Sequence, residues 1–251
     1  MQIADSRIIV TGGLSGLGSA FAATLAAAGA RVWVLDNAIA QPVQSDIAVA
    51  LPDAVERVHC DVGDETAVEA AVAAIDAAAG GIDVLVNNAA VLRDQVLVGK
   101  LGKRIKKHDT AAWHETLNTN LTGTFLMARE VAAAMIARRQ GGVIVNISSI
   151  SRKGNAGQSA YAASKAAVEA LTVTWSKELA PYRIRVAAIA PGFIPTGMTQ
   201  NIPPLFLSQL REQSPIRRFG TLDEFAHAIR FVIENDYFVG KTLELDGGIR
   251  F

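Results

Sequence analysis

The stretch Arg7-Ile8-Ile9-Val10-Thr11-Gly12-Gly13-Leu14-Ser15-Gly16-Leu17-Gly18 starts as a short apolar run and ends as a glycine-rich turn, and an alanine-rich segment follows it. The order strand, glycine-rich turn, helix is the context in which such a turn binds dinucleotide phosphates at a helix N-terminus. Gly12 allows the tight turn, Gly16 lets the backbone approach a pyrophosphate, and Gly18 lets helix and strand pack closely. The spacing G-x-x-x-G-x-G differs from the common G-x-G-x-x-G, so a glycine-rich turn without a ligand is the alternative interpretation.

A second predicted strand, residues 31–35, is followed by an acidic residue. Asp36 lies 24 residues after Gly12, near the spacing expected for a carboxylate that binds an adenosine ribose. A carboxylate at this position accepts hydrogen bonds from free ribose hydroxyls and repels a 2′-phosphate. The sequence therefore predicts NAD rather than NADP as the cofactor.

Strand-like and helical patterns alternate along the whole chain. We predict strands at 7–11, 31–36, 55–60, 82–87, 142–148, 184–190 and 241–245, and helices at 16–28, 64–79, 110–138, 158–180 and 221–234. This alternation predicts an α/β fold in which helices cover both faces of a parallel sheet. A cofactor is expected along the carboxyl ends of the strands. Because no linker or repeat interrupts the pattern, residues 1–251 are predicted to form one domain.

The composition sets limits on the class of protein. The chain has 251 residues, which is long enough to bury a sizeable core, and its 24 Lys and Arg balance its 24 Asp and Glu. The charge therefore gives no argument for binding nucleic acid or an anionic membrane. The single cysteine, Cys60, cannot form an intrachain disulfide, and no secretory signal or apolar run of transmembrane length is present. We expect a cytoplasmic protein, and the four scattered histidines predict no metal site.

Tyr161-Ala162-Ala163-Ser164-Lys165 lies in the predicted helix 158–180. A spacing of four places Tyr161 and Lys165 on one helical face. A free tyrosine has a pKa of about 10, and a nearby ammonium favours the phenolate and lowers that pKa. Such a pair can pass a proton to or from a substrate oxygen. Chance Tyr and Lys pairs are common on helices, so this interpretation depends on the other motifs.

Further motifs follow the other predicted strands. They are Asp61-Val62, Asn87-Asn88-Ala89-Ala90, Asn120-Leu121-Thr122-Gly123, Asn146-Ile147-Ser148-Ser149 and Pro191-Gly192. With the glycine turn and the Tyr/Lys pair, they make the chain resemble compact short-chain dehydrogenases/reductases over its whole length. The C-terminal half is similar to type-2 3-hydroxyacyl-CoA dehydrogenases and to 3-oxoacyl-carrier-protein reductase-like members. The resemblance implies a single-domain Rossmann fold with a seven-stranded parallel sheet and helices on both faces.

The resemblance also implies which residues contact NAD. They are Gly12, Ser15, Gly16, Leu17, Gly18, Asp36, Asp61, Val62, Asn88, Ala89, Ala90, Tyr161, Lys165, Pro191, Gly192, Ile194 and Thr196. Asp61-Val62 is expected near the adenine, and Ile194 and Thr196 near the carboxamide. Bracing of the sheet edge is the alternative role for Asn87 and Asn88. Ala90 stands where the family usually has Gly; it should be tolerated, with less space beside the cofactor.

The catalytic residues that the resemblance implies are Asn120, Ser149, Tyr161 and Lys165. Tyr161 exchanges the proton, one serine hydrogen-bonds the substrate oxygen, and Lys165 also binds the nicotinamide ribose. The usual thirteen-residue step back from Tyr161 reaches Ser148. Matching the preceding strand instead gives Ser149, with one residue missing from the loop 150–154. We favour Ser149, because loops absorb deletions more easily than buried strands.

Asn120 and Gly123 are poor helix formers in the middle of the predicted helix 110–138. They predict a local distortion that frees a backbone carbonyl. The resemblance implies that Asn120 helps to hold a water that links Lys165 to solvent. An asparagine facing solvent on an imperfect helix is the alternative.

Two segments bear on the substrate. Residues 193–219 carry apolar side chains among prolines and resemble the family's mobile substrate lid, although an ordinary amphipathic helix gives the same pattern. Residues 91–108 are longer than a minimal connection and contain Lys100, Lys103, Arg104, Lys106, Lys107 and His108. A solvated charged run is one interpretation of this basic insertion. A patch that binds the phosphates of CoA or an acidic carrier protein is the other.

Together these expectations describe an NAD-dependent oxidoreductase that interconverts a secondary alcohol and a ketone. The favoured substrate is a 3-hydroxyacyl/3-oxoacyl thioester, and small hydrophobic or aryl secondary alcohols are the alternative. Two other kinds of function remain as alternatives. One is a lyase or epimerase that retains NAD, and the other is a non-catalytic NAD-binding protein. The resemblance implies a homotetramer, because alanine-rich faces of the helices at 110–138 and 158–180 pair across a two-fold axis.

Overall fold

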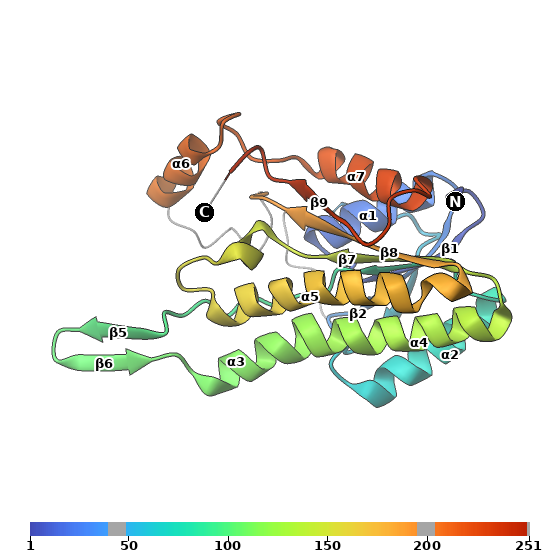
Figure 1. The fold of residues 1–251 in the computed structure, drawn as a ribbon, viewed down its shortest axis with the longest axis horizontal. Coiled ribbons are helices and arrows are strands. Elements are labelled where there is room, and N and C mark those ends of the chain that lie inside the picture. Colours follow the sequence, from blue (N-terminus) through green and yellow to red (C-terminus); the bar gives the residue numbers. More distant parts are fainter. Residues whose placement is uncertain (40–48, 195–203, 250–251) are drawn as a thin grey trace.

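The computed structural model describes residues 1–39, 49–194 and 204–249. Its main element is a seven-stranded sheet in the order β3-β2-β1-β4-β7-β8-β9, in which all neighbouring strands are parallel (Figure 1). The strands are β1 (Arg7–Thr11), β2 (Arg31–Asp36), β3 (Glu56–His59), β4 (Val84–Asn87), β7 (Gly142–Ile147), β8 (Ile184–Pro191) and β9 (Thr242–Leu245). The order reverses between β1 and β4, which is the switch point where a Rossmann-type sheet binds its ligand.

Helices cover both faces of the sheet. One face carries α1 (Gly16–Ala27) and α7 (Leu222–Glu234), and the other carries α2 (Glu65–Ala79), α4 (Gly123–Arg138) and α5 (Ser159–Glu178) (Figure 1). The sequence predicted all seven strands and the helices α1, α2, α5 and α7 to within two residues at each end. The α/β fold with a parallel sheet is therefore confirmed.

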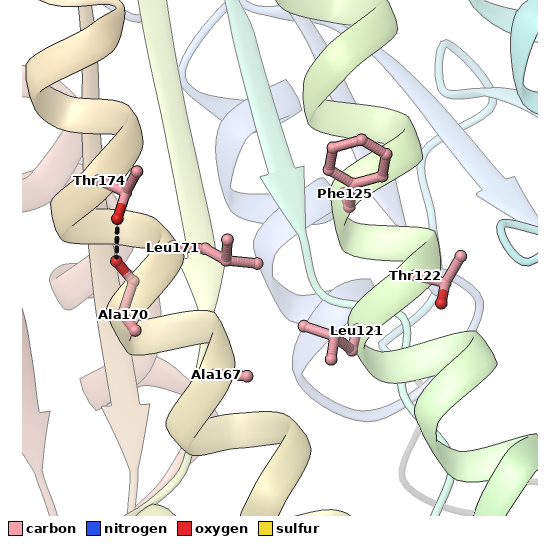
Figure 2. Close-up of a pocket in the computed structure, with 7 residues that line it drawn as sticks. All are labelled: Leu121, Thr122, Phe125, Ala167, Ala170, Leu171 and Thr174. Atoms are coloured by element: carbon pink, nitrogen blue, oxygen red, sulfur yellow. Dashed lines mark hydrogen bonds between the residues drawn. The ribbon is translucent and has the colours of Figure 1, made fainter.

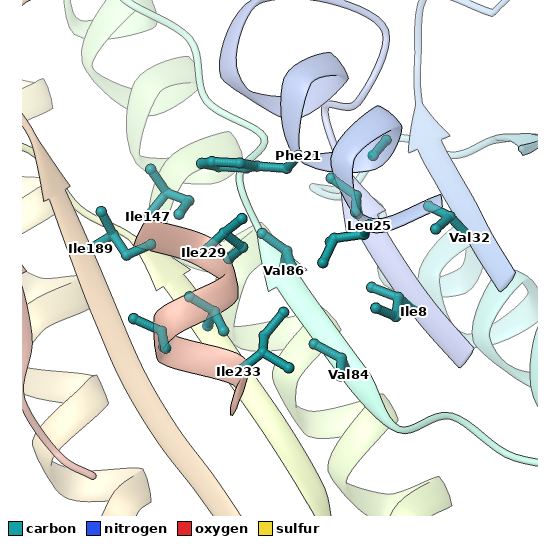
Figure 3. Packing of buried hydrophobic residues seen from close by; sticks show 14 of the residues in the cluster. Ile8, Phe21, Leu25, Val32, Val84, Val86, Ile147, Ile189, Ile229 and Ile233 are labelled. Atoms are coloured by element: carbon teal, nitrogen blue, oxygen red, sulfur yellow. The ribbon is translucent and has the colours of Figure 1, made fainter. Parts of the chain in front are cut away.

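Alternate residues of each central strand enter two separate cores. In β1, Ile8 packs in one core with Phe21 of α1 and Ile229 of α7 (Figure 3). The next residue, Ile9, packs in the opposite core with Met135 of α4. Because both faces are covered, the central strands are apolar at successive positions rather than at every second one.

The helix predicted at 110–138 is divided into three parts. The α-helix α3 (Thr110–Leu117) is followed by a π-helical segment, Asn118–Thr122, before α4 begins. Within this segment the N–H of Gly123 donates to the carbonyl of Asn118, five residues earlier. The predicted distortion around Asn120 is confirmed, and such π segments are frequent at functional sites.

The basic insertion folds as an antiparallel hairpin that the sequence did not predict. It consists of β5 (Val98–Leu101) and β6 (Arg104–Lys107), and it projects away from the sheet past the start of α3 (Figure 1). A further helix, α6 (Pro204–Gln213), lies within the predicted lid segment. Thr196 lies outside the described residues. Short 3₁₀ turns occur at Ile150–Lys153 and Ala180–Tyr182.

The described ranges lack two kinds of feature. None of their helices is both long and apolar enough to span a membrane. The same ranges contain no group of three or more His, Cys, Asp or Glu arranged to hold a metal ion.

Candidate active site

The glycine-rich turn lies between β1 and α1 at the carboxyl edge of the sheet. Gly12 has a φ of +63°, and a Cβ on it would lie 2.7 Å from the Cα of Ala89. A Cβ on Gly18 would overlap the carbonyl oxygen of Gly12. Ser15 is the N-cap of α1, and its exposed side chain makes no capping hydrogen bond to the helix. The turn therefore presents a helix N-terminus and an uncommitted hydroxyl, which fit the phosphates of a dinucleotide.

Asp36 ends β2 beside this turn. Its Oδ2 accepts a hydrogen bond from the N–H of Leu14 at 3.3 Å, and its Oδ1 accepts one from the N–H of Ala38 at 3.0 Å. The side chain is half-buried. The carboxylate thus lies against the turn, on the side where a ribose next to a bound pyrophosphate is expected.

The two asparagines at the carboxyl end of β4 brace the sheet edge. The Nδ2 of Asn88 donates to the carbonyls of Thr11 at 3.0 Å and Gly12 at 2.9 Å, and its backbone N–H donates to the Thr11 hydroxyl at 3.0 Å. The Nδ2 of Asn87 donates to Oδ1 of Asn146 at 3.0 Å. Asn88 therefore fixes the glycine turn itself, whereas Asn87 joins β4 to β7.

The other residues predicted to contact the cofactor lie around the same edge. The half-buried positions are Leu17, Ala89 and Ala90. Asp61 is exposed, and Val62 is buried. Gly192 lies against β9, since a Cβ on it would be 2.6 Å from the Cα of Asp246. The side chain of Ile194 is only 5 % exposed and packs in the core with α7. The expectation that Ile194 lies near the carboxamide therefore stays a prediction.

The two serines after β7 make different contacts. The hydroxyl of Ser148 donates to the backbone carbonyl of Lys165 at 3.0 Å. The hydroxyl of Ser149 lies close enough to the Tyr161 side chain to lower its pKa as a hydrogen-bond partner, and it accepts from the N–H of Ser151 at 3.1 Å. The structure therefore brings Ser149 to the tyrosine and commits Ser148 to the backbone of α5. This arrangement matches the alignment by strand rather than the thirteen-residue step.

Tyr161 and Lys165 lie one turn apart on α5. The Nζ of Lys165 lies 5.7 Å from the centroid of the Tyr161 ring and donates to the carbonyl of Ile147 at 2.7 Å. Burial lowers the pKa of Lys165 to about 8. Burial raises the pKa of Tyr161 to about 12; the hydrogen bond with Ser149 lowers it, and the charge of Asp94 adds to the rise. The prediction that Lys165 lowers the pKa of Tyr161 is wrong here, because loss of solvent dominates.

Asn120 is fully buried in the π-helical segment. Its Oδ1 accepts from the N–H of Val91 at 2.8 Å, and its Nδ2 donates to the carbonyl of Val91 at 3.0 Å. Its backbone carbonyl accepts from the hydroxyl of Thr124 at 2.9 Å. The carbonyl is therefore not free as predicted. The alternative of a solvent-facing asparagine is wrong, because the side chain fixes the segment that follows β4.

Sequence reasoning missed Asp94, which lies close enough to Tyr161 to raise its pKa. Burial raises the pKa of Asp94, and the hydrogen bond from Gln158 Nε2 to its Oδ2, at 2.9 Å, works in the opposite direction. The position of Asp94 in the sequence was the available signal. Asp94 belongs to the connection that leaves β4 at the edge of the sheet where the cofactor is expected, and only the basic residues of this connection enter the interpretation from sequence.

An apolar groove of about 440 Å³ lies on the outer side of α4 and α5. Figure 2 shows its lining, which consists of Leu121, Thr122, Phe125, Ala167, Ala170, Leu171 and Thr174. None of the predicted catalytic residues lines it. The groove instead lies on the alanine-rich helix faces for which the sequence predicted contact with a second copy.

Comparisons with known proteins agree with this geometry. The family described as Enoyl-(Acyl carrier protein) reductase matches residues 12–250. The 3-oxoacyl-[acyl-carrier-protein] reductase FabG of Thermotoga maritima is 38% identical over 259 residues, covering 99% of each chain. The short-chain reductase protein NovJ of Streptomyces niveus is 37% identical, covering 97% of this chain and 94% of its own. A solved structure from Sinorhizobium meliloti, assigned as a short-chain alcohol dehydrogenase, has a TM-score of 0.86 at 29% identity, covering 99% of this chain and 98% of its own.

Proposed function

Since the chain belongs to the short-chain dehydrogenase/reductase family, a family of oxidoreductases that bind a nicotinamide dinucleotide, we propose that it interconverts a secondary alcohol and a ketone with NAD(H). The observation that carries this proposal is the contact between Ser149 and Tyr161 beside Lys165. These three side chains meet at the edge of the sheet that also carries the glycine turn and Asp36. The same geometry argues against a non-catalytic NAD-binding protein.

When bound, the nicotinamide gives or accepts the hydride. In the direction of ketone reduction, the hydroxyl of Tyr161 donates a proton to the substrate oxygen. The hydroxyl of Ser149 hydrogen-bonds the same oxygen and stabilises its developing charge. Lys165, with a pKa of about 8, still carries its proton at neutral pH and supplies positive charge beside the tyrosine. In the direction of alcohol oxidation, Tyr161 takes the hydroxyl proton.

The favoured substrate is a 3-hydroxyacyl/3-oxoacyl thioester, which would place the enzyme in lipid metabolism. Its support is the similarity to a 3-oxoacyl-[acyl-carrier-protein] reductase over 99% of the chain. Small secondary alcohols are the second candidate, supported by the similarity to a structure assigned as an alcohol dehydrogenase. The test is NADH absorbance with a panel of acyl-CoA thioesters and short ketones. Absence of turnover on the whole panel would contradict both candidates.

The preference for NAD over NADP rests on the charges around the end of β2. Between Thr11 and Ala48 the sequence contains only one Lys or Arg, which is Arg31. Arg31 begins β2, at the end opposite Asp36, and lies over the ring of Trp33 at 4.9 Å from its centroid. No cation in this stretch is therefore placed beside Asp36 to bind a 2′-phosphate.

Asp36→Ala is expected to lower kcat/KM with NADH by roughly tenfold or more, since one hydrogen bond to a charged group contributes about 1.5–3 kcal/mol. The loss with NADPH should be smaller, because the variant also loses a charge that repels phosphate. The measurement is kcat/KM with both cofactors. Asp53→Ala, an exposed acid distant from the turn in sequence, serves as the matched control. Equal or better efficiency of the wild type with NADPH would overturn the preference.

The basic hairpin β5–β6 supports the proposal that the substrate carries negative charge. Between Gln95 and His108 the chain has five Lys or Arg and no Asp or Glu. The start of this segment is fixed near the candidate active site, because the N–H of Gln95 donates to the carbonyl of Gly157 at 2.8 Å, four residues before Tyr161. A CoA phosphate or an acidic carrier protein can therefore contact the hairpin while the acyl group enters the site.

Replacing Lys103, Arg104, Lys106 and Lys107 with Gln is expected to raise KM for a CoA thioester by about fivefold or more, since exposed pairs contribute ~0.2–1 kcal/mol each. KM for a short uncharged ketone should not change. Added salt should reproduce the effect in the wild type, because exposed charges are screened over about 10 Å at 0.1 M. If variant and wild type show identical kinetics on the thioester, the hairpin is a solvated surface segment without a role in binding. Small secondary alcohols then become the favoured substrates.

We also propose that the protein is a homotetramer in the cytoplasm, with no membrane or nucleic-acid partner. The groove between α4 and α5 supports a contact between copies, because Phe125 is 42% exposed there. Two isologous interfaces would give four copies with D2 symmetry. Light scattering should return about four times the chain mass of 26.5 kDa. A mass near that of one chain would exclude this assembly.

A further inference from the structure

Arg152 is a buried cation in the 3₁₀ turn that follows Ser149. Its side chain is only 3% exposed, which is unusual for arginine. Its Nε lies 2.5 Å from Oε2 of Glu169, and its Nη2 donates to Oε1 of Glu244 at 2.6 Å. Its Nη1 donates to the backbone carbonyl of Ser149 at 3.0 Å. A cation this deeply buried is tolerated only with such partners.

These contacts join three elements that carry the candidate active site. Ser149 follows β7 and meets Tyr161. Glu169 lies on α5, one helical turn beyond Lys165, so its carboxylate ties the guanidinium to the Tyr/Lys helix. Glu244 lies on β9, beside the β8 end where Gly192 packs. One guanidinium therefore connects the serine turn, the Tyr/Lys helix and the last strand.

The bonds to Ser149 act directly on its position. Both the backbone N–H of Arg152, at 3.2 Å, and its Nη1, at 3.0 Å, donate to the carbonyl of Ser149. The N–H of Ser151 donates to the Ser149 hydroxyl at 3.1 Å. The turn therefore holds both oxygens of Ser149, and the guanidinium links the turn to Glu169 of α5 and Glu244 of β9.

Arginine suits this position better than lysine would. Its planar fork donates in several fixed directions, whereas a lysine ammonium is a single point charge. Lys153, the next residue, pairs with Glu244 from the surface and is 57% exposed. The hydrogen bond from Lys153, together with the positive charges of Lys153 and Arg152, lowers the pKa of Glu244, so this carboxylate stays ionised. Lys153 makes no contact with Ser149 among the described residues and provides a matched control.

We propose that Arg152 is a positioning residue that holds the Ser149 hydroxyl in register with Tyr161 by joining the serine turn to Glu169 and Glu244. The inference rests on the proposed function. A catalytic group that is misplaced by about 1 Å can lose up to about a hundredfold in rate. The guanidinium therefore acts on catalysis through Ser149 and not by contact with the substrate.

The test is a double-mutant cycle on kcat with Arg152→Gln and Ser149→Ala. Arg152→Gln alone is expected to lower kcat by about tenfold or more, with little change in the affinity for NADH measured by fluorescence. In the Ser149→Ala background the same change should cost less than about twofold, because the serine that it positions is gone. Lys153→Gln should leave kcat unchanged, and Arg152→Lys should restore it only in part.

Full additivity in the cycle, or an unchanged kcat in Arg152→Gln, would overturn the positioning role. If Arg152→Gln does not fold, Glu244→Gln replaces it as the test, because it keeps an acceptor at a half-exposed site. Glu244→Gln is expected to cause a smaller loss of kcat that disappears in the Ser149→Ala background. No loss of kcat in Glu244→Gln would overturn the positioning role. A wild type without ketone-dependent oxidation of NADH would instead refute the proposed function. The two failures are therefore distinguishable.

Discussion

Ser149→Ala is expected to lower kcat by about a hundredfold or more, on the scale of losing one donor that stabilises a developing oxyanion. Ser148→Ala is expected to cost much less. The difference follows from their contacts, because Ser149 meets Tyr161 whereas Ser148 donates to the backbone carbonyl of Lys165. The main loss in Ser148→Ala should be stability, at about 0.5–1.5 kcal/mol for one lost hydrogen bond, because the Lys165 carbonyl also lies within the hydrogen-bond ladder of α5.

Two measurements separate the serines. Steady-state kinetics on the best ketone gives kcat, and urea unfolding gives the free energy of unfolding for both variants. Ser149→Ala should unfold close to the wild type while losing turnover, and Ser148→Ala should show the opposite pattern. The reverse ranking in kcat would show that the missing residue of the loop lies elsewhere, and that Ser148 is the serine that binds the substrate oxygen.

Lys165→Met is expected to lower kcat by roughly 10²- to 10⁴-fold, the range for losing a group that takes part in proton transfer. It should also remove a pH dependence of stability. The pKa of Lys165 is about 8 in the folded chain against an ordinary value of 10.5. Between these values the unfolded chain binds more protons than the folded chain, so stability rises with pH. The cost of burying the ammonium is complete below pH 8 and disappears as the pH rises through 10.5.

The difference in unfolding free energy, wild type minus Lys165→Met, should therefore rise by about 3 kcal/mol from neutral pH to pH 10.5, at about 1.4 kcal/mol per pKa unit. The carbonyl of Ile147, which loses its donor in the variant, adds an offset that does not change with pH. Tyr161 titrates in both proteins and cancels to first order. Urea unfolding at several pH values measures the difference, and a flat profile would show that Lys165 is not desolvated.

The sheet could be predicted from sequence because its signals are local. The apolar runs of β1, β4 and β7 stand out where burial on both faces demands apolar residues at every position. The hairpin gave no such signal. Val98 pairs with Lys107, and Lys100 pairs with Ile105, so each face mixes aliphatic and basic side chains and no alternation results. The helix at 110–138 was predicted with a distortion at Asn120 and Gly123 but not as three segments, because a π segment of five residues changes the helical period too little to show where each segment ends.

The residues of the candidate site likewise include some that could be predicted from sequence and others that could not. The glycine turn and Asp36 were found because their spacing is short and their roles follow from backbone geometry. The network around Arg152 could not be found, since it joins residues 92 positions apart and nothing in the sequence pairs them. The error over the pKa of Tyr161 has a similar origin. A spacing of four identifies a neighbouring charge, but it says nothing about how much water the fold removes.

The interlocked glycine turn has a consequence for how coenzyme preference can evolve. Any side chain at Gly18 meets the carbonyl of Gly12, and any side chain at Gly12 meets Ala89, so a viable change there needs several simultaneous substitutions. Within the described part of the chain, the Asp36 carboxylate hydrogen-bonds only backbone N–H groups, those of Leu14 and Ala38, so a shorter residue there displaces no neighbour. Single substitutions that change the coenzyme preference are therefore expected to be tolerated at the end of β2 but not in the glycine turn. A library built for this purpose should randomise Asp36 to Ala38 and leave the glycines fixed.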